Sequence, residues 1–86
     1  MIDGTTDLDI AARRVVHTKF FNNGQTCISP DYVLVAKGIK DEFLEKVKST
    51  IGTFYGENPA ESGALCGMVN EFHTQRVLEY LKDCGG

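Results

Sequence analysis

The chain is 86 residues long, with 42% hydrophobic residues and a net charge of −3 at pH 7. That length allows one small domain, and the hydrophobic content argues against wholesale disorder. The pair Arg13-Arg14 is the nearest approach to a basic cluster, so no nucleic-acid partner is expected. The apolar runs are too short to span a membrane, and the acidic start MIDGTTDLD is unlike a signal or transit peptide.

Three cysteines, Cys27, Cys66 and Cys84, are widely spaced and form no C-x-x-C pair. An odd count with this spacing argues against a disulfide framework and against a structural zinc site. A metal site built from the three cysteines and the two histidines lacks ligand spacing as well, so no metal is expected. Reduced thiols fit a cytosol-like compartment, and we expect a cytoplasmic location. Cys66 and Cys84 are expected to be structural or incidental.

The first predicted element is a helix that begins near Leu8. Thr6 and Asp9 have the spacing of a capping box. Apolar residues then recur at helical spacing as far as Phe20. The helix should stop within Asn22-Asn23-Gly24, because Asn and Gly tolerate the left-handed backbone at a helix end.

A loop over residues 25–31 leads to YVLVA at 32–36, which is short, apolar and β-branched and predicts a buried strand of a parallel sheet. A second helix is expected over about 39–55, with a Glu42–Lys46 pair on its surface and Gly56 at its end. A loop to about residue 68 precedes a third helix over about 70–82, which Asn70 could cap.

The predicted order is helix, loop, strand, helix, helix, which indicates the α/β class. One strand cannot form a sheet, and a strand like YVLVA needs neighbours at both edges and helices on both faces. The pattern therefore predicts an incomplete piece of a larger α/β domain with a parallel-type sheet.

The stretch FFNNGQTCISPD, residues 20–31, places a lone cysteine in a segment of turn-forming residues. Such a segment is usually exposed, whereas an unreactive cysteine is usually buried, so Cys27 is a candidate nucleophile. A structural thiol is the alternative. A thiol-hydrolase dyad of Cys27 with His73 is a further one, although no local protease signature supports it.

The same stretch resembles the cysteine signature of the aldehyde dehydrogenase superfamily, with Phe21, Gly24-Gln25, Thr26 and Cys27 at the matching positions. The run at 7–35 is similar to the helix, catalytic loop and strand of that family's catalytic domain. SPDYVLV, FYGENPAES and the residues Val69, Asn70, His73 and Arg76 are similar to its class 3 branch, which acts on fatty and aromatic aldehydes. Ser29 and the segment ALCGMVN, residues 64–70, depart from the usual pattern.

The resemblance implies that Cys27 is the catalytic residue of an NAD(P)-dependent oxidation of aldehydes to carboxylic acids. Its thiolate would form a thiohemiacetal and then a thioester, and backbone N–H groups beside it could stabilise the oxyanion. The family's general-base glutamate, oxyanion asparagine and cofactor-binding domain have no counterpart in residues 1–86. This chain would then be a partial catalytic domain that carries the nucleophile loop, contains no residues that bind NAD or NADP, and is inactive alone.

The resemblance also implies partners. The substrate would be a small-molecule aldehyde and the parent enzyme a homodimer, and some class 3 relatives are anchored in membranes. The alternative is a non-enzymatic truncated remnant or interaction module, which would use the apolar faces that are left without partners.

Overall fold

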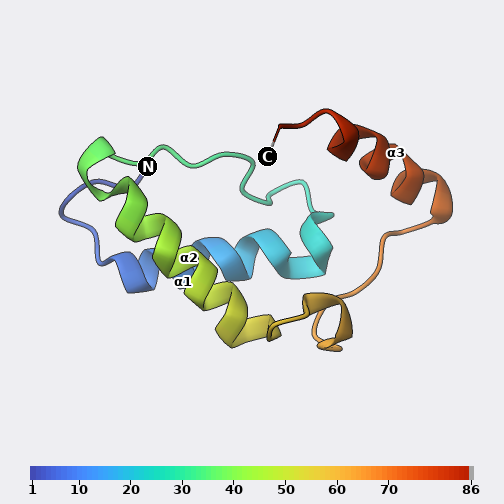
Figure 1. Cartoon of the computed structure of the whole chain (residues 1–86), viewed down its shortest axis with the longest axis horizontal. Coiled ribbons are helices and arrows are strands. Elements are labelled where there is room, and N and C mark those ends of the chain that lie inside the picture. Colours follow the sequence, from blue (N-terminus) through green and yellow to red (C-terminus); the bar gives the residue numbers. More distant parts are fainter. Residues whose placement is uncertain (86) are drawn as a thin grey trace.

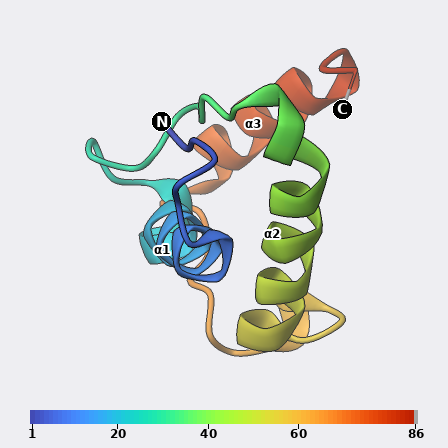
Figure 2. The same cartoon turned by 90° about the vertical axis from the view of Figure 1, so that its left-hand side faces the viewer.

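The computed structural model describes residues 1–85, which contain three α-helices: α1 (Leu8–Phe20), α2 (Lys40–Tyr55) and α3 (Glu71–Lys82). Short 3₁₀ turns occupy Phe21–Gly24, Lys37–Ile39 and Pro59–Glu61. Helices α1 and α2 cross and pack on each other, while α3 lies apart at the end of a long connection (Figure 1). Figure 2 looks along α1 and shows α2 against its side. The three predicted helices are confirmed.

The N-terminus of α1 is capped one residue later than the sequence predicted. The Asp7 carboxylate accepts hydrogen bonds from the N–H groups of Asp9 (3.0 Å) and Ile10 (3.2 Å). Thr6 is instead engaged in the preceding turn, where its N–H donates to the carbonyl of Asp3 (3.1 Å). The predicted Thr6 cap is therefore wrong. A carboxylate at this position also interacts favourably with the positive end of the helix dipole.

The predicted end of α2 and the predicted cap of α3 are confirmed. Gly56 follows Tyr55 with a φ of 76°, and its N–H donates to the carbonyl of Gly52. The Asn70 side chain accepts a hydrogen bond from the N–H of His73 (2.9 Å) and so satisfies one free donor of the first turn. The predicted Glu42–Lys46 pair is wrong: Lys46 reaches across to Asp9 of α1, with an Nζ–Oδ1 distance of 2.9 Å.

Within residues 1–85 the predicted strand and its parallel sheet are not formed, and a single parallel bridge takes their place. The N–H of Ile2 donates to the carbonyl of Leu34 (2.8 Å), and the N–H of Ala36 donates to the carbonyl of Ile2 (2.9 Å). The extended segment thus pairs in the predicted parallel direction, but within residues 1–85 it pairs with a single residue, Ile2. Because these bonds flank Val35, the backbone groups of Val35 face the opposite edge.

A small apolar core lies between α1, α2 and this extended segment. Ile2, Ala12 and Phe43 form its centre, and Phe43 is only 4% exposed. Residues around them are half-buried: Leu8, Ala11, Val15, Val33, Val35, Ile39 and Val47. Alternate residues of the extended segment point the other way, so Tyr32 and Leu34 are exposed. The helices therefore cover one face of the segment and leave the other bare.

The part of the chain that the structure describes holds no helix long and apolar enough to cross a membrane.

Candidate functional site

The loop that carries Cys27 begins with three left-handed residues. Helix α1 ends where Asn22 (φ 51°), Asn23 (φ 54°) and Gly24 (φ 75°) follow one another, as the sequence predicted. Left-handed backbone is tolerated best by glycine and asparagine. These residues turn the chain sharply away from the helix axis and send it back along α1 (Figure 1).

Cys27 itself lies at the second position of a four-residue turn. The N–H of Ser29 donates to the carbonyl of Thr26 (3.1 Å), which closes the turn around Cys27 and Ile28. Both of these side chains are exposed, and Cys27 carries a free thiol. The site residue predicted from the sequence is thus placed where a small molecule could reach its sulfur.

The side-chain amide of Gln25 joins this loop to a distant segment. Its Nε2 donates to the carbonyl of Gly67 (3.0 Å) and its Oε1 accepts from the N–H of Val69 (2.8 Å). The thiol of Cys66 adds a hydrogen bond to Oδ1 of Asn22 (3.3 Å). In the sequence, Gln25 was recognised only as part of the cysteine signature. It gave no signal of this contact, because the partners lie more than 40 positions away.

His73 is close to this loop without forming the alternative dyad. Its Nδ1 accepts a hydrogen bond from Nε of Arg76 (3.2 Å), and the Arg76 guanidinium lies over the ring of Tyr80. Within residues 1–85 no hydrogen bond joins His73 to Cys27. The described residues also contain no cluster of three metal-ligating side chains.

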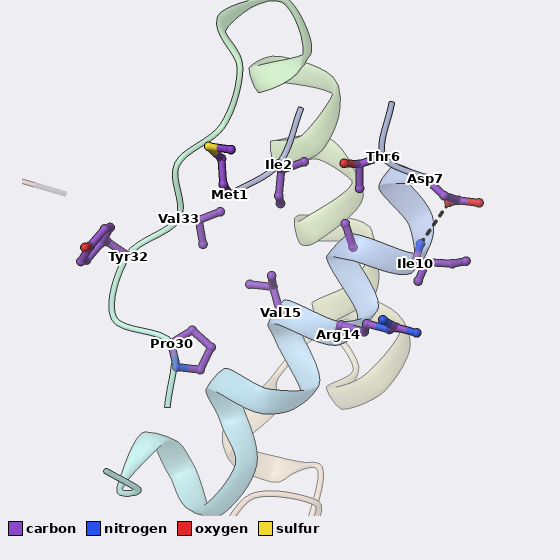
Figure 3. Close-up of a pocket in the computed structure, with 11 residues that line it drawn as sticks. Met1, Ile2, Thr6, Asp7, Ile10, Arg14, Val15, Pro30, Tyr32 and Val33 are labelled. Atoms are coloured by element: carbon purple, nitrogen blue, oxygen red, sulfur yellow. Dashed lines mark hydrogen bonds between the residues drawn. The ribbon is translucent and has the colours of Figure 1, made fainter. Parts of the chain in front are cut away.

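Two of the grooves beside the loop lie at its two ends. One, of about 700 Å³, lies between residues 22–25, the segment 66–69 and the His73–Val77 face of α3. The other, of about 410 Å³, lies between α1 and residues 30–33. In Figure 3, Val15, Pro30 and Val33 face one another across this second groove, and Tyr32 points away from α1. Its lining is mostly apolar, with Arg14 at one side, and Cys27 is not part of it.

The helix N-termini of the described residues do not fit the phosphates of a dinucleotide cofactor. A dinucleotide phosphate needs free backbone N–H groups at a helix N-terminus or in a glycine-rich loop. Asp7 and Asn70 cap α1 and α3 with their own side chains, and Asp41 and Glu42 make the first turn of α2 acidic. No glycine-rich phosphate loop occurs in the sequence.

The geometry is that of a helix, a left-handed turn and an exposed cysteine, followed by an extended segment. The sequence model of the aldehyde dehydrogenase family matches residues 1–85. The chain belongs to the aldehyde dehydrogenase family. The family resemblance found in the sequence is confirmed.

Similar members of the family are class 3 proteins. The chain is 41% identical over 80 residues to "Aldehyde dehydrogenase, dimeric NADP-preferring" of Mus musculus, covering 93% of this chain and 18% of that protein. It is 42% identical over 81 residues to "Aldehyde dehydrogenase family 3 member A2" of Pongo abelii, covering 94% of this chain and 17% of the relative. A Bos taurus relative is covered to 34%. The chain thus spans between about a sixth and a third of these relatives.

The fold of this segment also matches a solved aldehyde dehydrogenase. The structure described as the substrate-bound state of Staphylococcus aureus AldH superposes with a TM-score of 0.87 at 34% identity, over 94% of this chain and 18% of that one. This agreement supports the α/β class, because the segment takes in this chain the arrangement it takes within an α/β enzyme.

Proposed function

We propose that residues 1–86 are the part of a class 3-like aldehyde dehydrogenase that carries the nucleophile, within a longer catalytic domain. The observation that carries the proposal is the exposed thiol of Cys27 in the Thr26–Ser29 turn, which begins two residues after the left-handed Gly24. On this proposal the full-length enzyme oxidises aldehydes to carboxylic acids, and Cys27 is its catalytic residue.

The surface of the chain supports the idea of a longer domain. A compact protein of this mass exposes about 5,000 Å², whereas this chain exposes 6768 Å². Its radius of gyration is 14.2 Å, against about 12 Å for a compact chain of this length. The extra surface includes apolar side chains on α3 (Phe72, Tyr80 and Leu81) and on the outer face of the extended segment (Tyr32 and Leu34). Further chain packed on these faces would bury them.

The chemistry assigned to the chain's own residues is nucleophilic addition. The Cys27 sulfur, as thiolate, forms a bond to the carbonyl carbon, and the electron pair of the C=O bond moves to oxygen. Within residues 1–85, the N–H groups of Cys27 and Ile28 donate no hydrogen bond, so both are free to donate to that oxyanion. NAD or NADP, which parts of the longer chain outside residues 1–86 would hold, would accept the hydride from the same carbon, and this loss would leave a thioester on Cys27. Addition of water to the thioester carbonyl then releases the carboxylic acid and restores the Cys27 thiol.

The names of the relatives suggest two finer properties. The Mus musculus relative is called dimeric and NADP-preferring, and we propose by similarity a homodimer that uses NAD or NADP.

Three free thiols among the described residues fit a reducing, cytoplasmic location.

The test is made in the full-length enzyme with two cysteine variants. Cys27→Ala should lower kcat/KM for aldehyde oxidation by about 10⁴-fold or more, because the nucleophile is lost. Cys84→Ala is the matched control, since Cys84 is also an exposed thiol, and it lies just after α3, where its Sγ donates a hydrogen bond to the carbonyl of Leu81. Aldehyde oxidation by Cys27→Ala at the wild-type rate would reject the assignment.

A second candidate function is a non-enzymatic interaction module, which the exposed apolar face of α3 favours. The size of the native product separates the two. An antibody raised to residues 37–86 should detect a protein several times larger than 9.5 kDa in the source cells. A product of 9.5 kDa alone would reject the enzyme and support the module.

A further inference from the structure

The carboxamide of Gln25 pairs with residues 67–69 in the way that a peptide group pairs in a β-bridge. Its donor meets the carbonyl of Gly67 and its acceptor meets the N–H of Val69, so the two bonds flank Met68. Ile2 flanks Val35 with the same pattern, using its backbone N–H and carbonyl. The side chain of Gln25 therefore makes the same pair of hydrogen bonds to residues 67 and 69 that the backbone of Ile2 makes to residues 34 and 36.

This side chain is the principal polar link between the nucleophile loop and the segment before α3. Within residues 1–85 no backbone–backbone hydrogen bond joins residues 22–27 to residues 66–69. The Cys66–Asn22 contact is the other polar link, and it is a weak thiol hydrogen bond of 3.3 Å. The Gln25 amide is half-buried, and its Nε2 also donates to the carbonyl of Asn22 (3.0 Å). The position of this loop relative to α3 therefore depends mainly on Gln25.

The loop leaves the helix through an uncommon backbone conformation. Asn22 and Asn23 both have positive φ, a region that asparagine tolerates better than other residues with a side chain. Uncommon backbone conformations persist where surrounding contacts fix them. Gln25 is the first residue after this left-handed run, and it lies two positions before Cys27.

We propose that Gln25 is a positioning residue for Cys27: its side-chain bridge to Gly67 and Val69 holds the nucleophile turn in its reactive place. This role rests on the proposed function, because it presumes that Cys27 is the nucleophile. A shift of about 1 Å in a reacting group can cost on the order of 100-fold in rate. Loss of the bridge should therefore lower kcat more than it changes KM.

The test uses three variants of the full-length enzyme. Gln25→Met removes both bonds of the bridge, together with the local bond to the carbonyl of Asn22, and keeps the length of the side chain. Gln25→Glu keeps an acceptor for the N–H of Val69 and loses the donor to Gly67. Gln75→Met is the matched control, because Gln75 is an exposed glutamine of α3 that belongs neither to the bridge nor to the lining of the groove beside it.

Three readouts are measured for each variant: kcat and KM for an aldehyde, the rate at which iodoacetamide alkylates Cys27, and hydrogen exchange at the Val69 amide. We expect kcat to fall about 10- to 100-fold in Gln25→Met with KM changed less than about threefold, and Cys27 alkylation to change in parallel. The Val69 amide should exchange faster in Gln25→Met and stay protected in Gln25→Glu. Gln75→Met should match the wild type in all three.

Wild-type kcat in Gln25→Met, with faster exchange at Val69, would overturn the proposal, because the bridge would then exist without positioning Cys27. A lowered melting temperature with unchanged kcat and alkylation would do the same. If Gln25→Met does not fold, Gln25→Glu decides: reduced kcat with altered alkylation supports the role, and wild-type values reject it. If the wild-type enzyme oxidises no aldehyde, the proposed function fails, while alkylation and exchange still test the bridge.

Discussion

Gly24 and Gly52 should respond in opposite directions to the same substitution. Gly24 has a φ of +75°, and a Cβ added there would lie 3.3 Å from the carbonyl oxygen of Lys19, a backbone atom that cannot move aside easily. Alanine in this left-handed region costs about 1–2 kcal/mol. Gly52 lies inside α2, and apart from the neighbouring backbone of its own helix an added Cβ there would meet no atom within 4 Å among the described residues. Alanine there should stabilise the helix by about 0.5–1 kcal/mol.

The two alanine variants of the full-length enzyme should thus differ by roughly 1.5–3 kcal/mol in the free energy of unfolding. Each kcal/mol moves the melting temperature by about 2–4 °C in a domain of 150–250 residues, so thermal melts of both variants resolve the difference. Gly24→Asn separates the two causes at Gly24, because asparagine tolerates positive φ but adds the same Cβ. It should be less destabilised than Gly24→Ala. Equal stability of Gly24→Ala and wild type would refute the reasoning.

Two further predictions concern the packing of α1 against α2. Phe43→Ala should destabilise the full-length enzyme by about 3–5 kcal/mol in urea unfolding, because it opens a cavity beside Ile2 and Ala12, and Phe43→Leu should cost less; an unchanged urea midpoint in both would contradict this core. The hydrogen bond from Lys46 to Asp9, followed by their charge attraction, raises the pKa of Lys46 above its ordinary 10.5. Its stabilisation is therefore complete below pH 10.5 and is lost as the pH rises through the raised pKa. Lys46→Met should melt slightly below wild type at pH 8, and the difference in melting temperature should shrink as the pH rises beyond 10.5. A difference that grows at high pH would contradict this prediction.

Some features of the candidate site depend on neighbouring residues in the sequence, and others depend on residues far apart in it. The exposure of Cys27 and the left-handed turn before it depend on residues within a few positions, and the sequence predicted both. The bridge from Gln25 to Gly67 and Val69 joins residues more than 40 positions apart. A single glutamine in a polar loop has no pattern that indicates such a partner, so only the structure identified it.

The sequence by itself determined the three helices, the end of α2 and the cap of α3, but not the cap of α1. An α-helix forms hydrogen bonds between residues four positions apart, so its signals lie close together in the sequence. The apolar spacing, the cap at Asn70 and the end at Gly56 are signals of this kind. Tertiary structure decided that Lys46 pairs with Asp9 rather than with Glu42 on its own helix. It also decided that residues 32–36, which have the composition of a strand, form one bridge to Ile2. A strand exists only through its neighbours, and within residues 1–85 Ile2 is the one neighbour that the segment finds.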